Sequence, residues 1–289
     1  MNITPSCPPT PLLQRCRAIV KRHPLQFYFL LAYGGSWLIW LPSVFAKGGL
    51  GLLPFSLPWP LTIYSGVYLG PALAGIAMTA VCKGRPGLHS LLRRCIHWQV
   101  GWQWYLFALI GIPFIKFLGS LVLPGVLPTF QVTSLGSALL SYLALLIPAI
   151  LLSGLPEEIG WRGFALPRLQ QRYGALLGSL ILGILWGSWH LPMFFTSWEP
   201  AGTSLFTLCT FILGVTAASL LITWVFNRTQ ANLLIVMLIH GAQDAFNSGL
   251  LLSYPPGSGK DLGTLIAYGV AAILLLLMTR GQLGMRKQG

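Results

Sequence analysis

Long apolar stretches separated by short polar segments dominate the chain. Each stretch is about 20 residues long, the length that a helix needs to cross the hydrocarbon core of a bilayer. Their approximate bounds are Gln26–Ala46, Trp59–Cys82, Trp102–Val126, Leu135–Leu155, Ala175–Ser197, Thr203–Phe226, Ala231–Leu252 and Leu262–Thr279. A backbone inside lipid must satisfy its own hydrogen bonds, so runs of this length are expected to be helices. The pattern predicts an all-α polytopic membrane bundle of about eight transmembrane helices.

Prolines interrupt several of these stretches, and glycines lie where neighbouring helices would touch. The prolines inside the predicted spans are Pro42, Pro71, Pro113, Pro148 and Pro192. A proline removes one backbone donor and disturbs the turn before it, so we expect kinks at these positions. Gly75 and Gly183 are expected to permit close contact between helices.

Composition agrees with a membrane protein and excludes most soluble classes. Hydrophobic residues make up 55% of the 289 positions and charged residues only 8%, whereas a soluble domain has roughly 25% charged residues. A cytosolic globular enzyme, a disordered tail and a disulfide scaffold are therefore excluded. We predict a flexible cytoplasmic lead over residues 1–25, one transmembrane domain over 26–280 and a basic cytoplasmic tail over 281–289.

The charges are unevenly distributed and predict the orientation of the bundle. The chain has 18 Lys and Arg residues against 5 Asp and Glu, a net charge of +13. Most of the basic residues lie just outside the predicted spans, on the same side of the membrane. The positive-inside rule then predicts that both termini are cytoplasmic, in the plasma membrane. The net charge is thus a topology signal, and we expect no nucleic-acid partner.

Ionisable residues inside the predicted spans are costly to bury, so each is a candidate for function. The first group is Glu157 and Glu158 with Arg162, at the end of the fourth apolar stretch. Residues four apart share one face of a helix, so Glu158 can pair with Arg162. Glu157 is turned away by about 100° and stays available for chemistry.

Two further groups are expected at a comparable depth. His190 lies deep in the fifth stretch, and Glu157 and His190 are equally far from a predicted hairpin turn at Tyr173–Gly174. His240 and Asp244 are four residues apart in the seventh stretch and share one helix face. A network that merely joins helices could explain each group alone, but explains the three together less well.

Together these side chains are the components of a hydrolytic site. A carboxylate can activate water, histidines can bind a metal or an oxyanion, and an arginine can restrain the second acid. The soluble zinc-protease pattern His-Glu-x-x-His is absent from the sequence.

These residues resemble the CPBP (Abi) family, which includes the CAAX prenyl endopeptidases and bacteriocin-processing relatives. The family pattern Glu-Glu-x-x-x-Arg is met by Glu157, Glu158 and Arg162. Its Phe-x-x-x-His pattern is met at Trp186 and His190 with Trp in place of Phe, and its His-x-x-x-Asn/Asp pattern by His240 and Asp244. The resemblance covers a motif-bearing core of about residues 145–250.

The resemblance implies an intramembrane endopeptidase whose site faces the cytoplasm. It implies that Glu157 activates the attacking water, that Glu158 and Arg162 orient the site, and that two histidines bind metal or oxyanion. Asp244 differs from the members that carry Asn, and an ionised Asp can ligate a cation but cannot donate a hydrogen bond. We therefore predict a divalent metal, zinc, held by His190, His240 and Asp244.

Two classes of function remain open at this point. The first is proteolysis of a membrane-embedded or lipidated peptide. The alternative is a non-catalytic membrane partner, such as a bacteriocin self-immunity or regulatory protein. The complete set of motifs favours the enzyme. Nothing in the sequence separates a prenylated substrate from another membrane peptide, and nothing indicates the oligomeric state.

Overall fold

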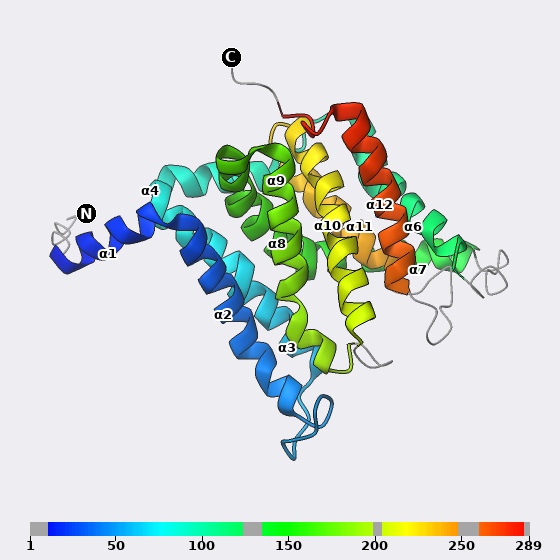
Figure 1. Ribbon diagram of the computed structural model, residues 1–289, viewed down its shortest axis with the longest axis horizontal. Coiled ribbons are helices and arrows are strands. Elements are labelled where there is room, and N and C mark those ends of the chain that lie inside the picture. Colours follow the sequence, from blue (N-terminus) through cyan, green and yellow to red (C-terminus); the bar gives the residue numbers. More distant parts are fainter. Residues whose placement is uncertain (1–10, 124–134, 199–203, 248–259, 286–289) are drawn as a thin grey trace, which may run out of the picture.

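The computed structural model describes residues 11–123, 135–198, 204–247 and 260–285, and these form helices joined by turns and short loops (Figure 1). The longer helices are α1 (Pro11–Arg22), α2 (Pro24–Phe45), α3 (Trp59–Val67), α4 (Leu73–Ile96), α6 (Ile112–Leu121), α7 (Leu135–Ala149), α9 (Leu166–Trp189), α10 (Leu205–Arg228), α11 (Leu233–Asn247) and α12 (Lys260–Thr279); α5 (Trp102–Leu106) and α8 (Leu155–Gly160) are short. No strand occurs in the described ranges. The all-α bundle is confirmed.

The predicted spans correspond to these helices, although the structure groups them differently. Within the described ranges, six helices are long and apolar enough to cross a membrane, and a shorter apolar helix covers Leu233–Phe246. One of the six, Gly136–Phe195, has 60 residues and contains two predicted spans. It reverses at Gly174, whose φ of 78° breaks the helix. Each of the eight apolar stretches thus contains helix, while eight crossings remain a prediction.

The helices are interrupted by wider π-helical turns, each associated with a proline. The turn η1 (Tyr68–Ala72) contains Pro71, and η2 (Phe107–Gly111) precedes Pro113. The turns η5 (Ile150–Gly154) and η6 (Trp161–Ala165) precede Pro156 and Pro167. A proline has no N–H for the carbonyl four residues earlier, so the backbone there is free to widen. Two of these turns enclose α8, the helix of the paired glutamates.

The N-terminal lead differs from our expectation over residues 11–22. This segment, predicted to be part of a flexible region, forms the helix α1. Its apolar and basic residues follow helical spacing, a pattern typical of helices that lie on a membrane surface. The guanidinium of Arg17 lies 3.4 Å from the carbonyl oxygen of Val81 in α4. Residues 1–10 lie outside the described ranges.

Small residues bring the helices around the site into close contact, as the sequence predicts. A Cβ added to Gly75 of α4 would lie 2.9 Å from the Cα of Gly160 at the end of α8. A Cβ added to Gly183 of α9 would lie 2.6 Å from the Cα of Thr216 in α10. These contacts leave no room for larger side chains, so they fix the positions of α8 and α9 within the bundle.

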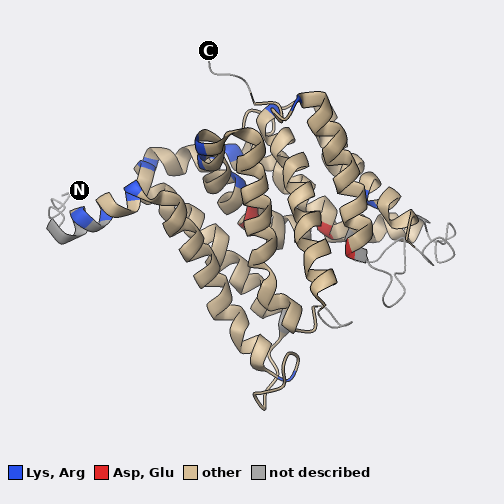
Figure 2. Ribbon diagram, viewed as in Figure 1, with Lys and Arg blue, Asp and Glu red and all other residues tan. Residues whose placement is uncertain are grey.

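Charged residues are separated along the bundle (Figure 2). Lys and Arg gather on α1, on α4 and at the end of the bundle near the C-terminus, while the opposite end carries few of them. The described Asp and Glu residues lie on α8, on α11 and in the first turn of α12. This asymmetry agrees with the predicted orientation, which stays a prediction.

Candidate active site

The short helix α8 carries the two successive glutamates and buries both of them inside the bundle. Glu157 is 3% exposed and Glu158 is fully buried. Successive residues of a helix point about 100° apart, so the two carboxylates have different neighbours. Pro156, in the first turn of α8, lacks a backbone N–H that would otherwise need a partner there. The local sequence therefore presents two acids from one rigid turn.

Glu158 belongs to a buried chain of charges. Its Oε1 accepts a hydrogen bond from Nη1 of Arg162 at 2.8 Å, and both side chains are fully buried. The same oxygen lies 2.8 Å from Nδ1 of His240. Since the carboxylate accepts, Nδ1 carries the hydrogen and Nε2 points the other way, toward Glu157. The predicted pair of Glu158 and Arg162 is present, and it sets the orientation of His240.

Arg162 is itself held from two further sides. Its Nη2 donates to Oγ of Ser219 in α10 at 3.3 Å. Its guanidinium carbon lies 4.3 Å from the centre of the Trp186 ring, a cation–π contact. Arginine thus joins α8, α9 and α10 at the level of the glutamates.

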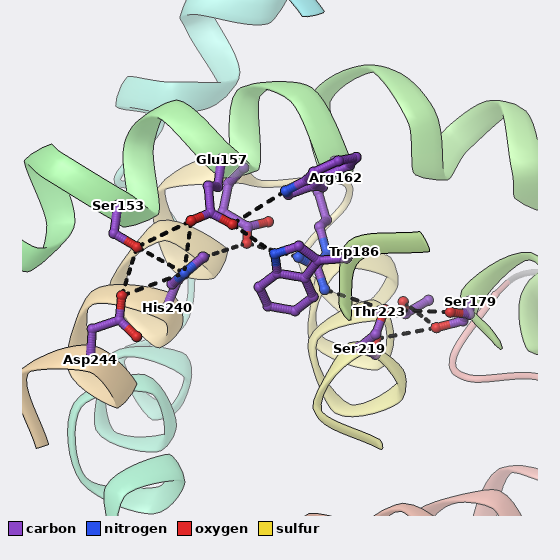
Figure 3. Close-up of polar contacts among 11 residues, drawn as sticks. Ser153, Glu157, Arg162, Ser179, Trp186, Ser219, Thr223, His240 and Asp244 are labelled. Atoms are coloured by element: carbon purple, nitrogen blue, oxygen red, sulfur yellow. Dashed lines mark hydrogen bonds and ion pairs between the residues drawn. The ribbon is translucent and has the colours of Figure 1, made fainter. Parts of the chain in front are cut away.

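One carboxylate oxygen of Glu157 accepts hydrogen bonds from two indoles, and the other faces Ser153 and His240 (Figure 3). Its Oε2 accepts from the indole N–H groups of Trp186 at 2.7 Å and Trp161 at 3.3 Å. Its Oε1 lies 3.4 Å from Oγ of Ser153 and 3.9 Å from Nε2 of His240. This division orients the carboxylate and directs one oxygen toward the histidine.

His240 and Asp244 come from one face of α11, as predicted. Oδ2 of Asp244 lies 3.6 Å from Nε2 of His240. Helix α11 reaches this position because glycines line its contact with η5. A Cβ on Gly154 would lie 2.7 Å from the carbonyl oxygen of Met237, and one on Gly241 would lie 2.4 Å from Ile150. The helix therefore approaches the acids closely enough for direct contact.

His190 lies in the same cavity but makes different contacts. Its Nδ1 lies 2.9 Å from the carbonyl oxygen of Trp186, which can only accept. Its ring packs edge-on against Trp189 and Phe211 and stacks with Trp198 at a centroid distance of 6.2 Å. The hairpin at Gly174 brings α9 back beside α8, as the sequence predicts. His190 thus borders the cavity from within a cluster of aromatic side chains.

A cavity of about 350 Å³ connects these groups. It is bordered by Ser153, Glu157, His190, His240 and Asp244, and otherwise mainly by apolar and aromatic side chains such as Ile63, Val67, Leu145, Met193, Trp198 and Phe211. Concave, mostly apolar surfaces with a few convergent polar groups are typical of small-ligand and substrate sites. Of these polar groups, Ser153, Glu157, His240 and Asp244 lie close to one another on the cavity wall.

The predicted zinc ligands His190, His240 and Asp244 do not form a ready-made metal site. Among the described residues, no group of three or more His, Cys, Asp or Glu side chains is arranged to hold a metal ion. His240 and Asp244 are neighbours. The hydrogen bond of His190 to Trp186 uses only Nδ1 and leaves Nε2 able to bind a metal. The metal therefore stays a prediction.

The sequence missed two contributors to this site. Ser153 is not among the predicted site residues, although it is four residues before Glu157 and so shares its helix face. Its Oγ donates to Oδ2 of Asp244 at 2.6 Å and lies 3.0 Å from Nε2 of His240. Trp161 is not among them either, yet its indole N–H donates a hydrogen bond to the carboxylate of Glu157. Helical spacing could have identified both residues.

Comparison with known proteins points to one family for this part of the chain. Residues 138–246 match the family model described as type II CAAX prenyl endopeptidase Rce1-like. The chain is also 30% identical over 95 residues to CAAX prenyl protease 2 of Methanococcus maripaludis. That match covers 32% of this chain and 35% of the archaeal protein, so the chain spans about a third of the length of this curated relative. Residues 138–246, which match the family model, contain all six predicted site residues. Over residues 138–246 the chain is therefore similar to the CAAX prenyl endopeptidases.

Proposed function

We propose that the protein is an intramembrane endopeptidase that hydrolyses a peptide bond with water activated by Glu157. The observation that carries the proposal is that the two carboxylate oxygens of Glu157 have different neighbours. Two indole N–H groups hold Oε2, and Oε1 is left 3.9 Å from Nε2 of His240. A water molecule can bridge a gap of this size with hydrogen bonds to both atoms.

The proposed reaction proceeds in two proton transfers. Glu157 takes a proton from the bridging water while the water oxygen attacks the carbonyl carbon of the scissile bond. A tetrahedral intermediate with a negatively charged oxygen results. Glu157 then returns the proton to the nitrogen of the leaving amine as the C–N bond breaks. The carboxylate ends the cycle ionised, and the products are an acid and an amine.

The other site residues are proposed to orient this chemistry. Glu158 fixes the ring of His240 through Nδ1, and Arg162 holds Glu158 from the opposite side. His240 then keeps Nε2 near the attacking water, and with hydrogens on both ring nitrogens it can also donate from Nε2 to the oxyanion. His190 and Asp244 border the cavity in which the scissile bond would lie.

We propose that the substrate is a membrane-embedded or lipidated peptide. The cavity lies among apolar, membrane-length helices, and its wall is mainly apolar and aromatic. An apolar substrate segment would be favoured there because its apolar surface is removed from water. The name of the archaeal relative describes a protease of CAAX prenyl substrates, which supports the same class.

The experiment compares membranes that carry the wild type with membranes that carry Glu157→Gln. Peptide ends across the membrane proteome are measured by mass spectrometry. We expect substrates to accumulate uncut with Glu157→Gln. The control variant Asp261→Asn also removes one carboxylate, from the first turn of α12, and should cut normally. Identical peptide ends with wild type and Glu157→Gln would refute the protease and favour the non-catalytic partner.

A divalent ion, zinc, is kept as a separate proposal with its own test. Elemental analysis of the purified protein should then give about one zinc per chain, because three protein ligands suffice for a catalytic site. Full proteolytic activity of a preparation without zinc would refute the ion and leave the function of Glu157 intact.

A further inference from the structure

Ser153 lies where the polar groups of the site converge. Its Oγ is 2.6 Å from Oδ2 of Asp244, 3.0 Å from Nε2 of His240 and 3.4 Å from Oε1 of Glu157. These atoms come from η5, α8 and α11, so one hydroxyl joins three elements (Figure 3). Ser153 is only partly buried and borders the cavity. It can therefore reach a bound substrate as well as its neighbours.

The neighbours of Ser153 offer few hydrogen-bond donors for the oxyanion of the reaction. Hydrolysis of a peptide bond creates an oxyanion, which needs donors directed at it. Glu157 and Asp244, as carboxylates, can only accept. The indole N–H groups of Trp161 and Trp186 are directed at Oε2 of Glu157. On the other side of that carboxylate, the groups in reach are the Ser153 hydroxyl and Nε2 of His240.

His190 does not replace this donor in its present orientation. Its Nδ1–H is directed at the carbonyl oxygen of Trp186. In a neutral imidazole the second nitrogen then carries no hydrogen and can only accept. A serine hydroxyl both accepts and donates, and it rotates freely about its C–O bond. It can therefore turn its hydrogen from Asp244 toward a new acceptor.

We propose that Ser153 is a further catalytic residue, which donates a hydrogen bond to the oxyanion at a position where Asp244 can only accept. In the resting site the hydroxyl donates to Oδ2 of Asp244. When the oxyanion forms, the hydrogen turns toward it, and no covalent bond to the serine is made. The inference rests on the proposed hydrolysis by Glu157 and assigns one more residue to it.

The test is a comparison of Ser153→Thr with Ser153→Val. These two side chains have the same shape and the same β-branching, and only threonine keeps the hydroxyl. The probe is a fluorogenic farnesylated CAAX peptide, together with any peptide that Glu157-dependent cleavage identifies in membranes. Loss of one oxyanion donor lowers kcat by about 10²–10³-fold. We expect Ser153→Val to lose activity in this range, with KM almost unchanged, and Ser153→Thr to stay within about tenfold of the wild type.

A second arm separates the catalytic donor from a merely structural contact. Asp244→Asn provides an amide N–H near the same position. In that background we expect Ser153→Val to cost much less than in the wild type, so the two substitutions are not additive. A structural contact between Ser153 and Asp244 would couple the two substitutions in thermal stability, whereas the proposed donor couples them in kcat. If the branched variants do not fold, Ser153→Ala removes the hydroxyl without branching, and it is compared with the wild-type serine.

Each outcome decides the inference. Equal activity of Ser153→Thr and Ser153→Val overturns it, while loss of activity in Glu157→Gln would still support the proposed hydrolysis. An acyl adduct on Ser153 in intact-protein mass spectrometry also overturns it, because the serine would then be a nucleophile. If the wild type cuts none of these peptides, the proposed function fails and the inference fails with it.

Discussion

Arg162 and Glu158 form an ion pair of 2.8 Å in which neither side chain is exposed to solvent. Removing two charges from water is costly, and their attraction compensates only when the geometry and the remaining hydrogen bonds are favourable. Here the carboxylate also accepts from His240, and the guanidinium also contacts Ser219 and Trp186. The pair is therefore better understood as a device that orients His240 than as a source of stability.

Removal of one partner should destabilise the bundle strongly. Arg162→Met leaves the carboxylate of Glu158 buried without its cation, and such a change costs about 3–5 kcal/mol. We expect a large loss in thermal stability of the detergent-purified protein, measured by intrinsic fluorescence. Activity should be lost as well, because the acceptor of His240 is disturbed.

The matched control is the double variant Arg162→Met with Glu158→Met. Replacing both members of a buried pair by apolar side chains of similar volume is often neutral for stability. We expect the double variant to recover much of the lost stability but none of the activity. A double variant as unstable as Arg162→Met alone would contradict this account of the pair.

Close contact between η5 and α11 is the second requirement of the site. A Cβ on Gly154 would lie 2.7 Å from the backbone oxygen of Met237 and 3.5 Å from Cβ of His240. Because a backbone atom cannot move aside cheaply, Gly154→Ala should push α11 away from the acids. We expect lower thermal stability and a loss of activity of at least about tenfold, since misplacement of about 1 Å can cost 10²-fold.

Gly269 provides the control for this substitution. It lies in α12, and a Cβ there would meet no atom within 4 Å. Alanine is a better helix former than glycine by about 1 kcal/mol. Gly269→Ala should therefore leave activity unchanged and stability equal or higher. A loss of activity in both variants would show that the effect is not specific to the contact of α11.

Much of this arrangement follows from spacing along the chain. Four-residue spacing predicted the contact of Glu158 with Arg162 and that of His240 with Asp244, and both are present. A glycine between two apolar stretches predicted the hairpin at Gly174. Each of these inferences needs only helix geometry within one segment of the chain.

Contacts between helices were harder to predict because they depend on packing. Nothing in local spacing connects Trp186 with Glu157 or His240 with Glu158, which lie 29 and 82 residues apart. The widened turns on either side of α8 also change which residues share a face. The sequence therefore identified the acids and histidines, but the structure was needed to find which oxygen of Glu157 is held.

The reversal at Gly174 should tolerate few other residues. Its φ of 78° and ψ of 175° lie in a region that is essentially confined to glycine and costs other residues about 1–3 kcal/mol. Space is not the constraint, because a Cβ there would meet no atom within 4 Å. Gly174→Val should thus destabilise the protein in thermal unfolding. Gly174→Asn should destabilise it as well, because asparagine tolerates the left-handed helical region but not this value of ψ. Unchanged stability of Gly174→Asn would show that the turn does not hold this backbone conformation.

The orientation of the bundle can be tested at the two ends of α10. This helix has 24 residues, from Leu205 to Arg228, and is about 36 Å long, enough to cross the hydrocarbon core. Single cysteines at Ser204 and Arg228, in a chain without its other cysteines, both occupy exposed positions. Since basic residues concentrate on the cytoplasmic side, a membrane-impermeant maleimide should label the Ser204 position in intact cells. It should label the Arg228 position only after the membrane is opened. The opposite pattern would reverse the predicted topology and place both termini outside the cytoplasm.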